Sequence, residues 1–519
     1  MNALKLNGTD LTLEDLREVV YQRRPVLLEA DARLLVEHAR ALVDEVVAGE
    51  DVAYAITTGV GKLADIRIPG DQLRELQVNL IRSHAMGVGP PLPEAETRAM
   101  LLLSANSLAK GHSGVRPVVI DTLCEMLNRG VHPIIPSQGS VGASGDLAPL
   151  AHVALALIGE GEVVLEGKSM TSAEAFKQAG IKPLQPQAKE AISLINGTQA
   201  MLATGALALL AAETLVDSAD VIAALSLDAL QGTVVAFDER IQQARPHPGQ
   251  IRTAANLRRM LEGEDAIRDS HQDCGRVQDA YSLRCIPQVH GAVRDTLHHC
   301  RQVLEIEMNS AVDNPLVFLA PKQVGAPQAP GPQSMPGDIL SGGNFHGQPL
   351  AFVLDFLAIA LAALAGISER RLERLVNPAL SEGLPPFLAT GAGLNSGLMM
   401  AQIVAASLVS ENKVLGHPAS VDSITTSGNK EDFVSMGMTS ANKLRRVVEN
   451  TRNVLALEAL AAAQALDCLL PLKTSHRGQQ AHALIRSVAA TVERDRVLKP
   501  DIQRAAKLIA EGNLAAVLK

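Results

Sequence analysis

Residues 201–230 read MLATGALALLAAETLVDSADVIAALSLDAL, an almost unbroken stretch of alanine, leucine and other small or apolar residues. Alanine and leucine are strong helix formers, and a run this apolar predicts a helix that is covered on most sides. Runs of the same texture follow at 288–310, 347–372, 396–416 and 439–468. Together they predict a mainly α fold, built on a large central helical bundle with loops at its ends.

The first 200 residues have a different texture, with more glycine, proline and short loops. Thr12 and Asp15 precede an amphipathic run and predict a capped helix start. Residues 320–340 are rich in proline and glycine and predict a surface loop. The sequence shows no internal repeat and no clear linker. We therefore expect an N-terminal domain at 1–200, docked on a bundle that occupies 201–519.

The composition excludes several classes of protein. The chain has 47 basic and 56 acidic residues, a net charge of -9, so it lacks the basic footprint of a nucleic-acid-binding protein. Aromatic residues make up 2%, without tryptophan, so Ala, Leu and Val must fill the core. The apolar run 350–367 is interrupted by Asp355, which is costly in lipid and favours a buried bundle helix over a membrane span.

Cysteine and histidine usage favours a reducing, cytoplasmic compartment and argues against a metal site. The five cysteines are scattered and never form a C-x-x-C pair, so we expect neither a disulfide framework nor a zinc site. The N-terminus lacks the apolar core of a signal peptide. No H-E-x-x-H or G-x-S-x-G motif occurs, and Gly59-Val60-Gly61-Lys62 lacks the spacing of a phosphate loop.

The segment 139–150, GSVGASGDLAPL, permits an unusual reaction. In a compressed loop, the amide nitrogen of Gly145 can attack the carbonyl carbon of Ala143, because glycine tolerates strained backbone. Loss of water, followed by dehydration of Ser144, leaves an exocyclic methylidene that is a strong electrophile. Asp146 is expected to cap the helix that follows.

GSVGASGDLAPL resembles the signature of the aromatic amino acid ammonia-lyase family, which includes histidine, phenylalanine and tyrosine lyases and related aminomutases. The resemblance continues through motifs along nearly the whole chain. These contain Tyr54 in AYAITTGVGKLAD, His84 in LQVNLIRSHAMGVG, Asn196 in LINGTQ, Gln278, Tyr281 and Arg284 in VQDAYSLRCIPQVHG, Asn314 in NSAVDNP, Phe345 in SGGNFHGQP and Glu431 in TTSGNKEDFVSMG. The resemblance implies a bundle like that of the fumarase and aspartase superfamily.

It also implies a cofactor made from the chain, a 4-methylidene-imidazol-5-one formed from Ala143-Ser144-Gly145, and no external cofactor. Tyr54 would be the base that removes the β-proton, with Tyr281 and Glu431 as further catalytic residues. Arg284 would clamp the substrate carboxylate, a task suited to a planar guanidinium. The side chains expected to line the site are those of His84, Asn196, Gln278, Asn314, Phe345 and Met399.

Three positions favour L-histidine as the substrate and trans-urocanate as the product. His84 and Met399 match residues of histidine lyases, and Glu431 matches their pocket carboxylate, which can accept an imidazole N–H. In contrast, Ala55, Val60 and Phe433 stand where the family usually has Gly, Phe and, in many histidine lyases, His.

Tyrosine or phenylalanine lyase and tyrosine aminomutase activities remain alternatives, since several stretches also resemble those enzymes. A non-enzymatic scaffold is a further alternative, but the intact Ala143-Ser144-Gly145 and Tyr54 argue against it. A fumarase-type lyase would need a G-S-S-x-M-P-x-K-x-N loop, which the chain lacks.

The apolar helices predict a homotetramer, because helices that are apolar around most of their circumference must be covered. The resemblance adds that each site draws on three chains. It implies that the Tyr54 loop and the Tyr281–Arg284 segment come from different subunits than the Ser144 loop.

Overall fold

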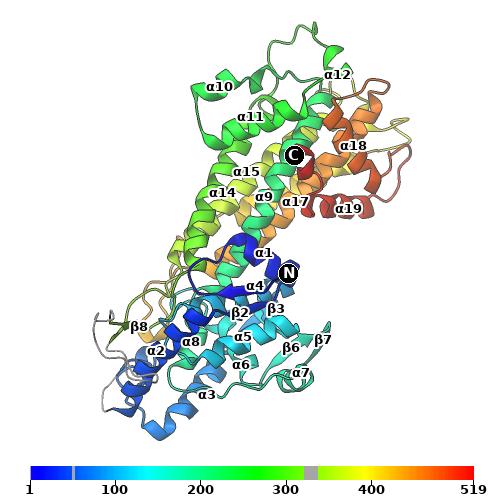
Figure 1. Cartoon of the computed structure of the whole chain (residues 1–519). Helices are drawn as coiled ribbons and strands as arrows, with labels where there is room; N and C mark the ends of the chain where they lie inside the picture. The colour runs from blue at the N-terminus through cyan, green and yellow to red at the C-terminus, as the bar shows by residue number, and fades with distance from the viewer. Residues whose placement is uncertain (1, 50–52, 321–336) are drawn as a thin grey trace. The chain divides into compact units, whose positions relative to one another are not determined.

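The computed structural model describes residues 2–49, 53–320 and 337–519, so most of the Pro/Gly-rich loop expected at 320–340 lies outside the described residues. The chain divides into two units (Figure 1). The first contains residues 1–207, 301–354 and 419–442, and the second contains 208–300, 355–418 and 443–519. The first break falls close to the expected boundary at 200. The structure differs from the expectation in assigning two later segments to the first unit.

The first unit is built from short helices and small sheets. The capping box predicted at Thr12 is present, with the Thr12 and Asp15 side chains each accepting from the other's backbone N–H. Its helices before residue 199 are α1 Leu13–Tyr21, α2 Ala30–Ala48, α3 Leu73–His84, α4 Glu94–Ala109, α5 Pro117–Arg129, α6 Leu147–Leu157, α7 Ser172–Ala179 and α8 Glu190–Ile195.

Four small sheets complete this unit. The pair β1 (Leu4–Leu6) and β2 (Val26–Leu28) is parallel, with Leu4 opposite Val26. The antiparallel sheets are β3 Val88–Pro91 with β5 Pro136–Gln138, β4 His132–Pro133 with β6 Glu162–Leu165 and β7 Lys168–Thr171, and β8 Leu316–Leu319 with β9 Gly337–Leu340.

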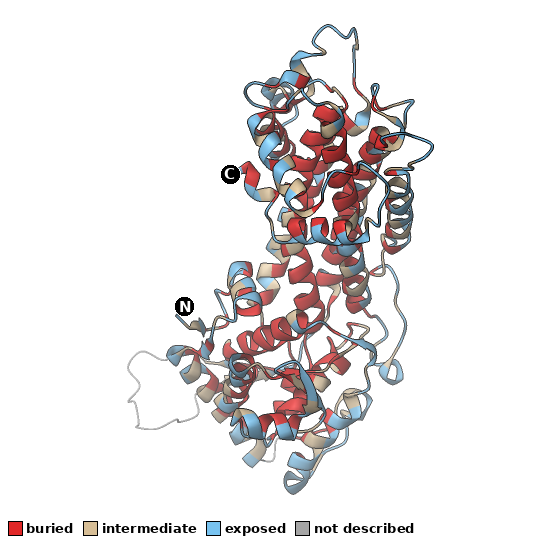
Figure 2. Cartoon of the chain, turned by 90° about the vertical axis from the view of Figure 1, so that its right-hand side faces the viewer, coloured by how far each residue is buried: buried red, intermediate tan, exposed pale blue. Residues whose placement is uncertain are grey.

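The predicted helical runs all form helices, shifted by a few residues at their ends. They are α9 Gln199–Ala229, α14 Ile286–Met308, α15 Gln348–Val376, α16 Met399–Leu415 and α17 Gly437–Cys468. The remaining helices are α10 Glu239–Ala244, α11 Pro248–Met260, α12 Ala266–Asp269, α13 Tyr281–Arg284, α18 His476–Val488 and α19 Lys499–Ala510. The mainly α fold is thereby confirmed, and the inward faces of the long helices are buried (Figure 2).

Two of these helices, α9 and α15, are long and apolar enough to cross a membrane by length and composition. The most apolar window of α9 is 83% buried inside the chain and that of α15 is 61% buried. Asp355 of α15 is itself buried and lies 2.8 Å from the Lys443 ammonium. A buried ion pair and burial within the chain are features of a bundle core, as the sequence predicted.

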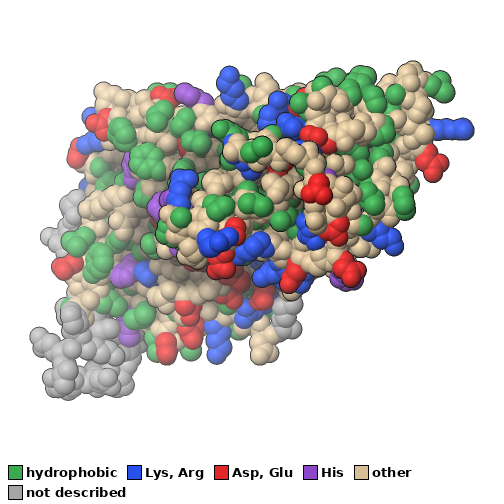
Figure 3. All heavy atoms as spheres, turned by 90° about the horizontal axis from the view of Figure 1, so that it is seen from above, with side chains coloured by type: hydrophobic (Ala, Val, Ile, Leu, Met, Phe, Trp, Pro, Cys, Tyr) green, Lys and Arg blue, Asp and Glu red, His purple; other side chains and the backbone are tan. Residues whose placement is uncertain are grey.

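The molecular surface carries both signs of charge. On the face shown in Figure 3, Lys and Arg side chains alternate with Asp and Glu side chains over short distances. No disulfide joins any of the five cysteines, all of which lie in the described residues.

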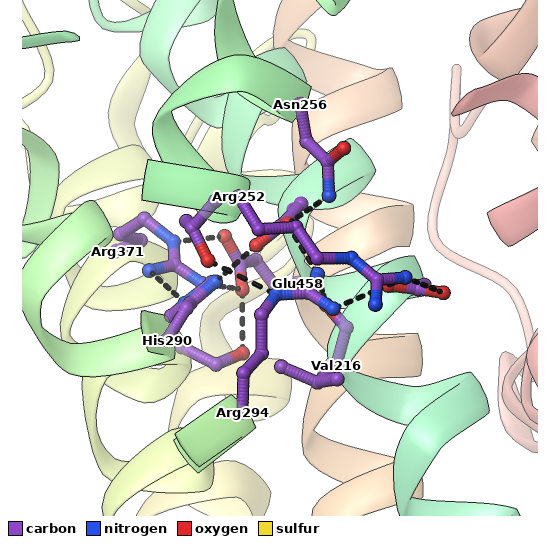
Figure 4. A network of polar contacts seen from close by, with 11 residues as sticks. Val216, Arg252, Asn256, His290, Arg294, Arg371 and Glu458 are labelled. Atoms are coloured by element: carbon purple, nitrogen blue, oxygen red, sulfur yellow. Dashed lines mark hydrogen bonds and ion pairs between the residues drawn. The ribbon is translucent and has the colours of Figure 1, made fainter. Parts of the chain in front are cut away.

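A buried polar network joins the helices α9, α11, α14, α15 and α17 of the second unit (Figure 4). Arg371 of α15 binds both carboxylate oxygens of Glu458 of α17, at 2.6 and 3.0 Å. His290 of α14 donates from Nδ1 to Asp220 of α9 at 2.8 Å, and Arg294 donates to the same carboxylate. Burial lowers the pKa of His290, so the ring stays neutral and its Nε2 can accept from Arg371.

We expect Glu458→Ala to destabilise the second unit by about 3–5 kcal/mol, because it strands the buried guanidinium of Arg371. Ser226 and Ser368, which donate to the same carboxylate, would lose their partner as well. Urea unfolding measures the change. Glu449→Ala, on an exposed position of the same helix, is the control and should shift stability by less than about 0.5 kcal/mol. Equal stability of the two variants would contradict this account.

Candidate active site

The Ala143-Ser144-Gly145 loop lies between β5 and α6 and turns on two glycines with left-handed backbone. Gly142 has φ 69° and Gly145 has φ 72°. A Cβ at residue 145 would overlap the backbone of Gly197, and a Cβ at residue 142 would overlap the Ser435 hydroxyl. Only glycine fits at either position. The loop is therefore pressed against two segments that are distant in sequence.

Hydrogen bonds hold both ends of this loop. The Gly142 carbonyl accepts from the Gly347 N–H at 3.1 Å and from the Ser435 hydroxyl at 3.0 Å. At the other end, the Asp146 N–H donates to the Gly197 carbonyl at 2.6 Å. The three residues between are thus fixed from outside, as a compressed loop requires.

Ser144 is held at two of its atoms. Its hydroxyl donates to Oε1 of Glu431 at 2.5 Å, and its carbonyl oxygen accepts from Nδ2 of Asn196 at 2.6 Å. Asn196 is buried at the C-terminal end of α8, and its Oδ1 has no hydrogen-bond partner in the described part of the chain. The structure therefore brings together the loop, Asn196 and Glu431.

A tight turn presents Glu431 to the loop. Thr426 and Glu431 pair as a single antiparallel bridge, and Ser427, Gly428 and Asn429 between them all have positive φ. The Thr426 hydroxyl donates to Oε2 of Glu431 at 2.5 Å. One carboxylate oxygen is thus fixed by the turn, and the other is directed at Ser144.

Asp146 does not cap α6 through its side chain, so this expectation is wrong. It stands at the N-cap position, but its Oδ2 accepts from the Met201 N–H at 2.8 Å and its Oδ1 from the Ser140 hydroxyl at 2.7 Å. Complete burial raises the pKa of Asp146 to about 6, although both hydrogen bonds oppose the rise. The residue instead ties the loop to the first turn of α9.

The Tyr54 loop packs beside the Glu431 turn of the same chain. The Tyr54 hydroxyl oxygen accepts from the Gly61 N–H at 3.2 Å. A Cβ at Gly61 would lie 3.0 Å from the Ser427 hydroxyl, so the loop contacts the turn closely. The Tyr54 loop and the Glu431 turn of one chain therefore lie in contact. Ala55, where the family usually has glycine, has φ 57°, which explains that preference.

The Phe345 segment borders the loop through Gly347. The neighbouring His346 stacks on Phe433, with ring centroids 6.1 Å apart, and its Nε2 lies 3.2 Å from the Phe433 carbonyl oxygen. Both polar atoms of the Asn314 amide bind the start of this segment. Its Nδ2 donates to the Ser341 hydroxyl at 3.0 Å, and its Oδ1 accepts from the Gly342 N–H at 2.7 Å. In this chain Asn314 therefore braces the Phe345 segment.

His84 ends α3, which packs against α6 and α8, the helices that adjoin the loop and Asn196. Its Nδ1 lies 2.8 Å from the Leu80 carbonyl, the geometry of an Nδ1–H donor, which leaves Nε2 as an acceptor. The ring is thus oriented by its own helix.

The remaining predicted residues belong to the second unit. Tyr281 is 70% exposed, and the Arg284 guanidinium carbon lies 4.6 Å from its ring centroid. Within the described residues the buried Nε of Arg284 has no hydrogen-bond partner. Gln278 is exposed just before α13, and Met399 is 36% exposed at the start of α16. Gln278, Tyr281 and Met399 therefore face the surface of the second unit.

Several positioning residues escaped the sequence analysis, among them Gly197, Gly347, Thr426 and Ser435. Gly197 follows Asn196 directly, so the Asn-Gly pair was a signal for a tight backbone approach. Ser435 gave no local signal, because its partner Gly142 lies 293 residues away, whereas Thr426 lies in the same turn as its partner Glu431. Among the described residues, no group of three or more His, Cys, Asp or Glu side chains is arranged to hold a metal ion.

Comparisons with known proteins agree on one family. The family model for aromatic amino acid lyases matches residues 11–487. The histidine ammonia-lyase of Koribacter versatilis is 68% identical over 520 residues and is covered completely, as is this chain.

Two solved structures are also similar. The histidine ammonia-lyase of Trypanosoma cruzi is 41% identical, with a TM-score of 0.89 and coverage of 100% of this chain and 95% of that one. The tyrosine aminomutase of Streptomyces globisporus is 39% identical, with a TM-score of 0.91 and coverage of 99% and 98%.

Proposed function

The chain belongs to the aromatic amino acid lyase family, and we propose that it eliminates ammonia from L-histidine to give trans-urocanate. The observation that carries the proposal is Ser144 held between Asn196 and Glu431 in a glycine-bounded loop. The carbon–nitrogen lyase activity fits the full-length similarity to histidine ammonia-lyases. Such a reaction belongs to histidine breakdown.

The loop fits a 4-methylidene-imidazol-5-one made from Ala143, Ser144 and Gly145. The lack of a Cβ at Gly145 lets its backbone lie against Gly197, and Gly142 is fixed by two donors. Once formed, the group supplies an electrophilic methylidene carbon that captures the substrate. Asn196 strengthens this electrophile, because its Nδ2 donates to the carbonyl oxygen of Ser144. No external cofactor or metal is then needed.

The other side chains are assigned by their chemistry. Tyr54 removes the β-proton through its phenolic oxygen, which acts as a base in its deprotonated form and accepts a hydrogen bond from the Gly61 N–H. Arg284 binds the substrate carboxylate, and its Nε is available for this. The unpaired Oδ1 of Asn196 can accept from the substrate ammonium. The walls of the substrate site are completed by Gln278, Tyr281, Phe345 and Met399.

Histidine is favoured over tyrosine by two polar side chains that we assign to the site. Glu431 offers a carboxylate and His84 an Nε2 acceptor, both suited to an imidazole N–H. Phe433, which stands where many histidine lyases have His, leaves Glu431 and His84 in place. Its side chain is 60% exposed and stacked on His346.

The active form we propose is a cytoplasmic homotetramer whose only ligand is a small amino acid. Apolar side chains stay exposed on one face of α15 and α16, namely Phe356, Ile359, Met400, Ile403 and Val404. A second copy of the chain would cover them. The Tyr281–Arg284 segment would then complete the site of another chain.

We expect kcat/KM for L-histidine to exceed that for L-tyrosine by at least about 10²-fold, because a pocket built to pair a polar ring rejects one that leaves its groups unpaired. Separate incubations, followed by the absorbance of urocanate and of coumarate, measure the ratio. Chromatography for β-tyrosine tests the aminomutase alternative. Faster turnover of tyrosine by either route would reject histidine as the substrate.

A further inference from the structure

We propose that Glu431 also acts while the electrophile is being made: it removes the Cα proton of Ser144 and returns that proton to the departing hydroxyl. This inference rests on the proposed function, because it concerns the formation of the group on which that function depends. It gives Glu431 a role that precedes any encounter with substrate.

The contact that carries the inference is between the encoded serine and the carboxylate. The Ser144 hydroxyl donates to Oε1 of Glu431 at 2.5 Å. This hydroxyl must leave as water in the dehydration. Among the residues that the structure describes, Glu431 is the hydrogen-bond partner of the leaving oxygen. A titratable group therefore stands at the bond that has to break.

The turn keeps Glu431 in this orientation. Its Oε2 is occupied by the Thr426 hydroxyl at 2.5 Å, and its backbone pairs with that of Thr426. The carboxylate cannot rotate away from Ser144 without breaking the first of these contacts. Oε1 is thus left as the oxygen that exchanges a proton, and the Cα that carries this proton lies two bonds from the hydroxyl oxygen that Oε1 contacts.

The step balances without a co-reactant. In the ring closure, the bond between Gly145 N and Ala143 C forms. The Ala143 oxygen leaves as the first water with the protons of the Gly145 and Ser144 N–H groups, and a C=N bond remains between Ala143 C and Ser144 N. Glu431 then accepts the Ser144 Cα proton, and the negative charge moves to the Ser144 carbonyl oxygen, where Asn196 donates at 2.6 Å. As the Cβ–Oγ bond breaks, Glu431 gives the proton to the hydroxyl. The second water leaves and the carboxylate is regenerated.

Intact-protein mass tests this directly. The wild type should be lighter than its sequence by two waters. Glu431→Gln should be lighter by one, since its amide still accepts from the Ser144 hydroxyl but cannot carry a proton. Peptide mapping should place the retained water within residues 143–145. Asp432→Asn, an exposed carboxylate on the same segment, is the matched control and should lose two waters.

The variant Glu431→Asp distinguishes loss of the carboxylate from a general folding defect. It keeps a carboxylate, so its second water should leave at least about 10-fold faster than that of Glu431→Gln during refolding. Complete loss of two waters by Glu431→Gln, or equal rates for the two variants, would overturn the inference and leave the proposed function standing. A wild type of full sequence mass would instead reject the proposed electrophile and, with it, the proposed function.

Discussion

Replacing Ser144 with alanine is expected to reduce histidine turnover by at least about 10³-fold, because accelerations of 10⁶-fold and more cannot survive the loss of the main electrophile. An alanine at this position has no hydroxyl to lose, so no methylidene can form. The variant should fold, since the Ser144 side chain makes one hydrogen bond, to Glu431, and the loop is held mainly through Gly142 and Asp146. Steady-state assays and intact mass measure the two effects together.

The control is Ser169→Ala, on an exposed position of β7. It should retain wild-type turnover and a mass two waters below its sequence. Ser144→Ala should lie no more than one water below its sequence. Normal activity in a Ser144→Ala protein of full sequence mass would show that ammonia is eliminated by different chemistry.

The helical part of this fold could be predicted because its signals are local. Each apolar run is a continuous sequence property, and α9 and α17 begin within two residues of where their runs begin, at Gln199 and Gly437. The capping box at Thr12 uses residues three positions apart. Local chemistry of this kind does not depend on what lies elsewhere in the chain.

The composition of the first unit could not be predicted in the same way. It incorporates 301–354 and 419–442 through contacts such as that from Ser435 to Gly142, which spans 293 residues. A serine and a glycine carry no pattern that reveals such a pairing. Asp146 was misjudged for the same reason: a local cap was expected, but distant Met201 and nearby Ser140 bind its carboxylate instead.

The burial of α9 weakens the argument that its apolar surface forms an interface between subunits. Its apolar circumference predicted an interface, yet 83% of its most apolar window is buried within the chain. The exposed apolar side chains of α15 and α16 are the stronger basis for association. An apolar helix can therefore belong to the core of a monomer, as α9 does. Only a helix with an exposed apolar face, such as α15 or α16, indicates contact with another copy of the chain.

A mixture of two inactive variants, Ser144→Ala and Arg284→Met, is expected to recover activity if Arg284 serves a site on another chain. Arg284→Met removes the carboxylate clamp but keeps a long apolar side chain. In a random one-to-one mixture, about one quarter of the sites would combine an intact Ser144 with an intact Arg284. Turnover should therefore rise from background to about one quarter of the wild-type value. Co-refolding with two affinity tags isolates the mixed oligomers for assay.

The matched control pairs Ser144→Ala with Glu431→Gln. These side chains are hydrogen-bonded within one chain, so every site of the mixture carries one lesion and activity should stay at background. Tyr54→Phe should behave like Glu431→Gln, because its loop packs on the Glu431 turn of the same chain. Recovery in the Glu431 mixture would refute the intrachain site. Isolated mixed oligomers of Ser144→Ala and Arg284→Met that stay inactive would refute a site shared between chains.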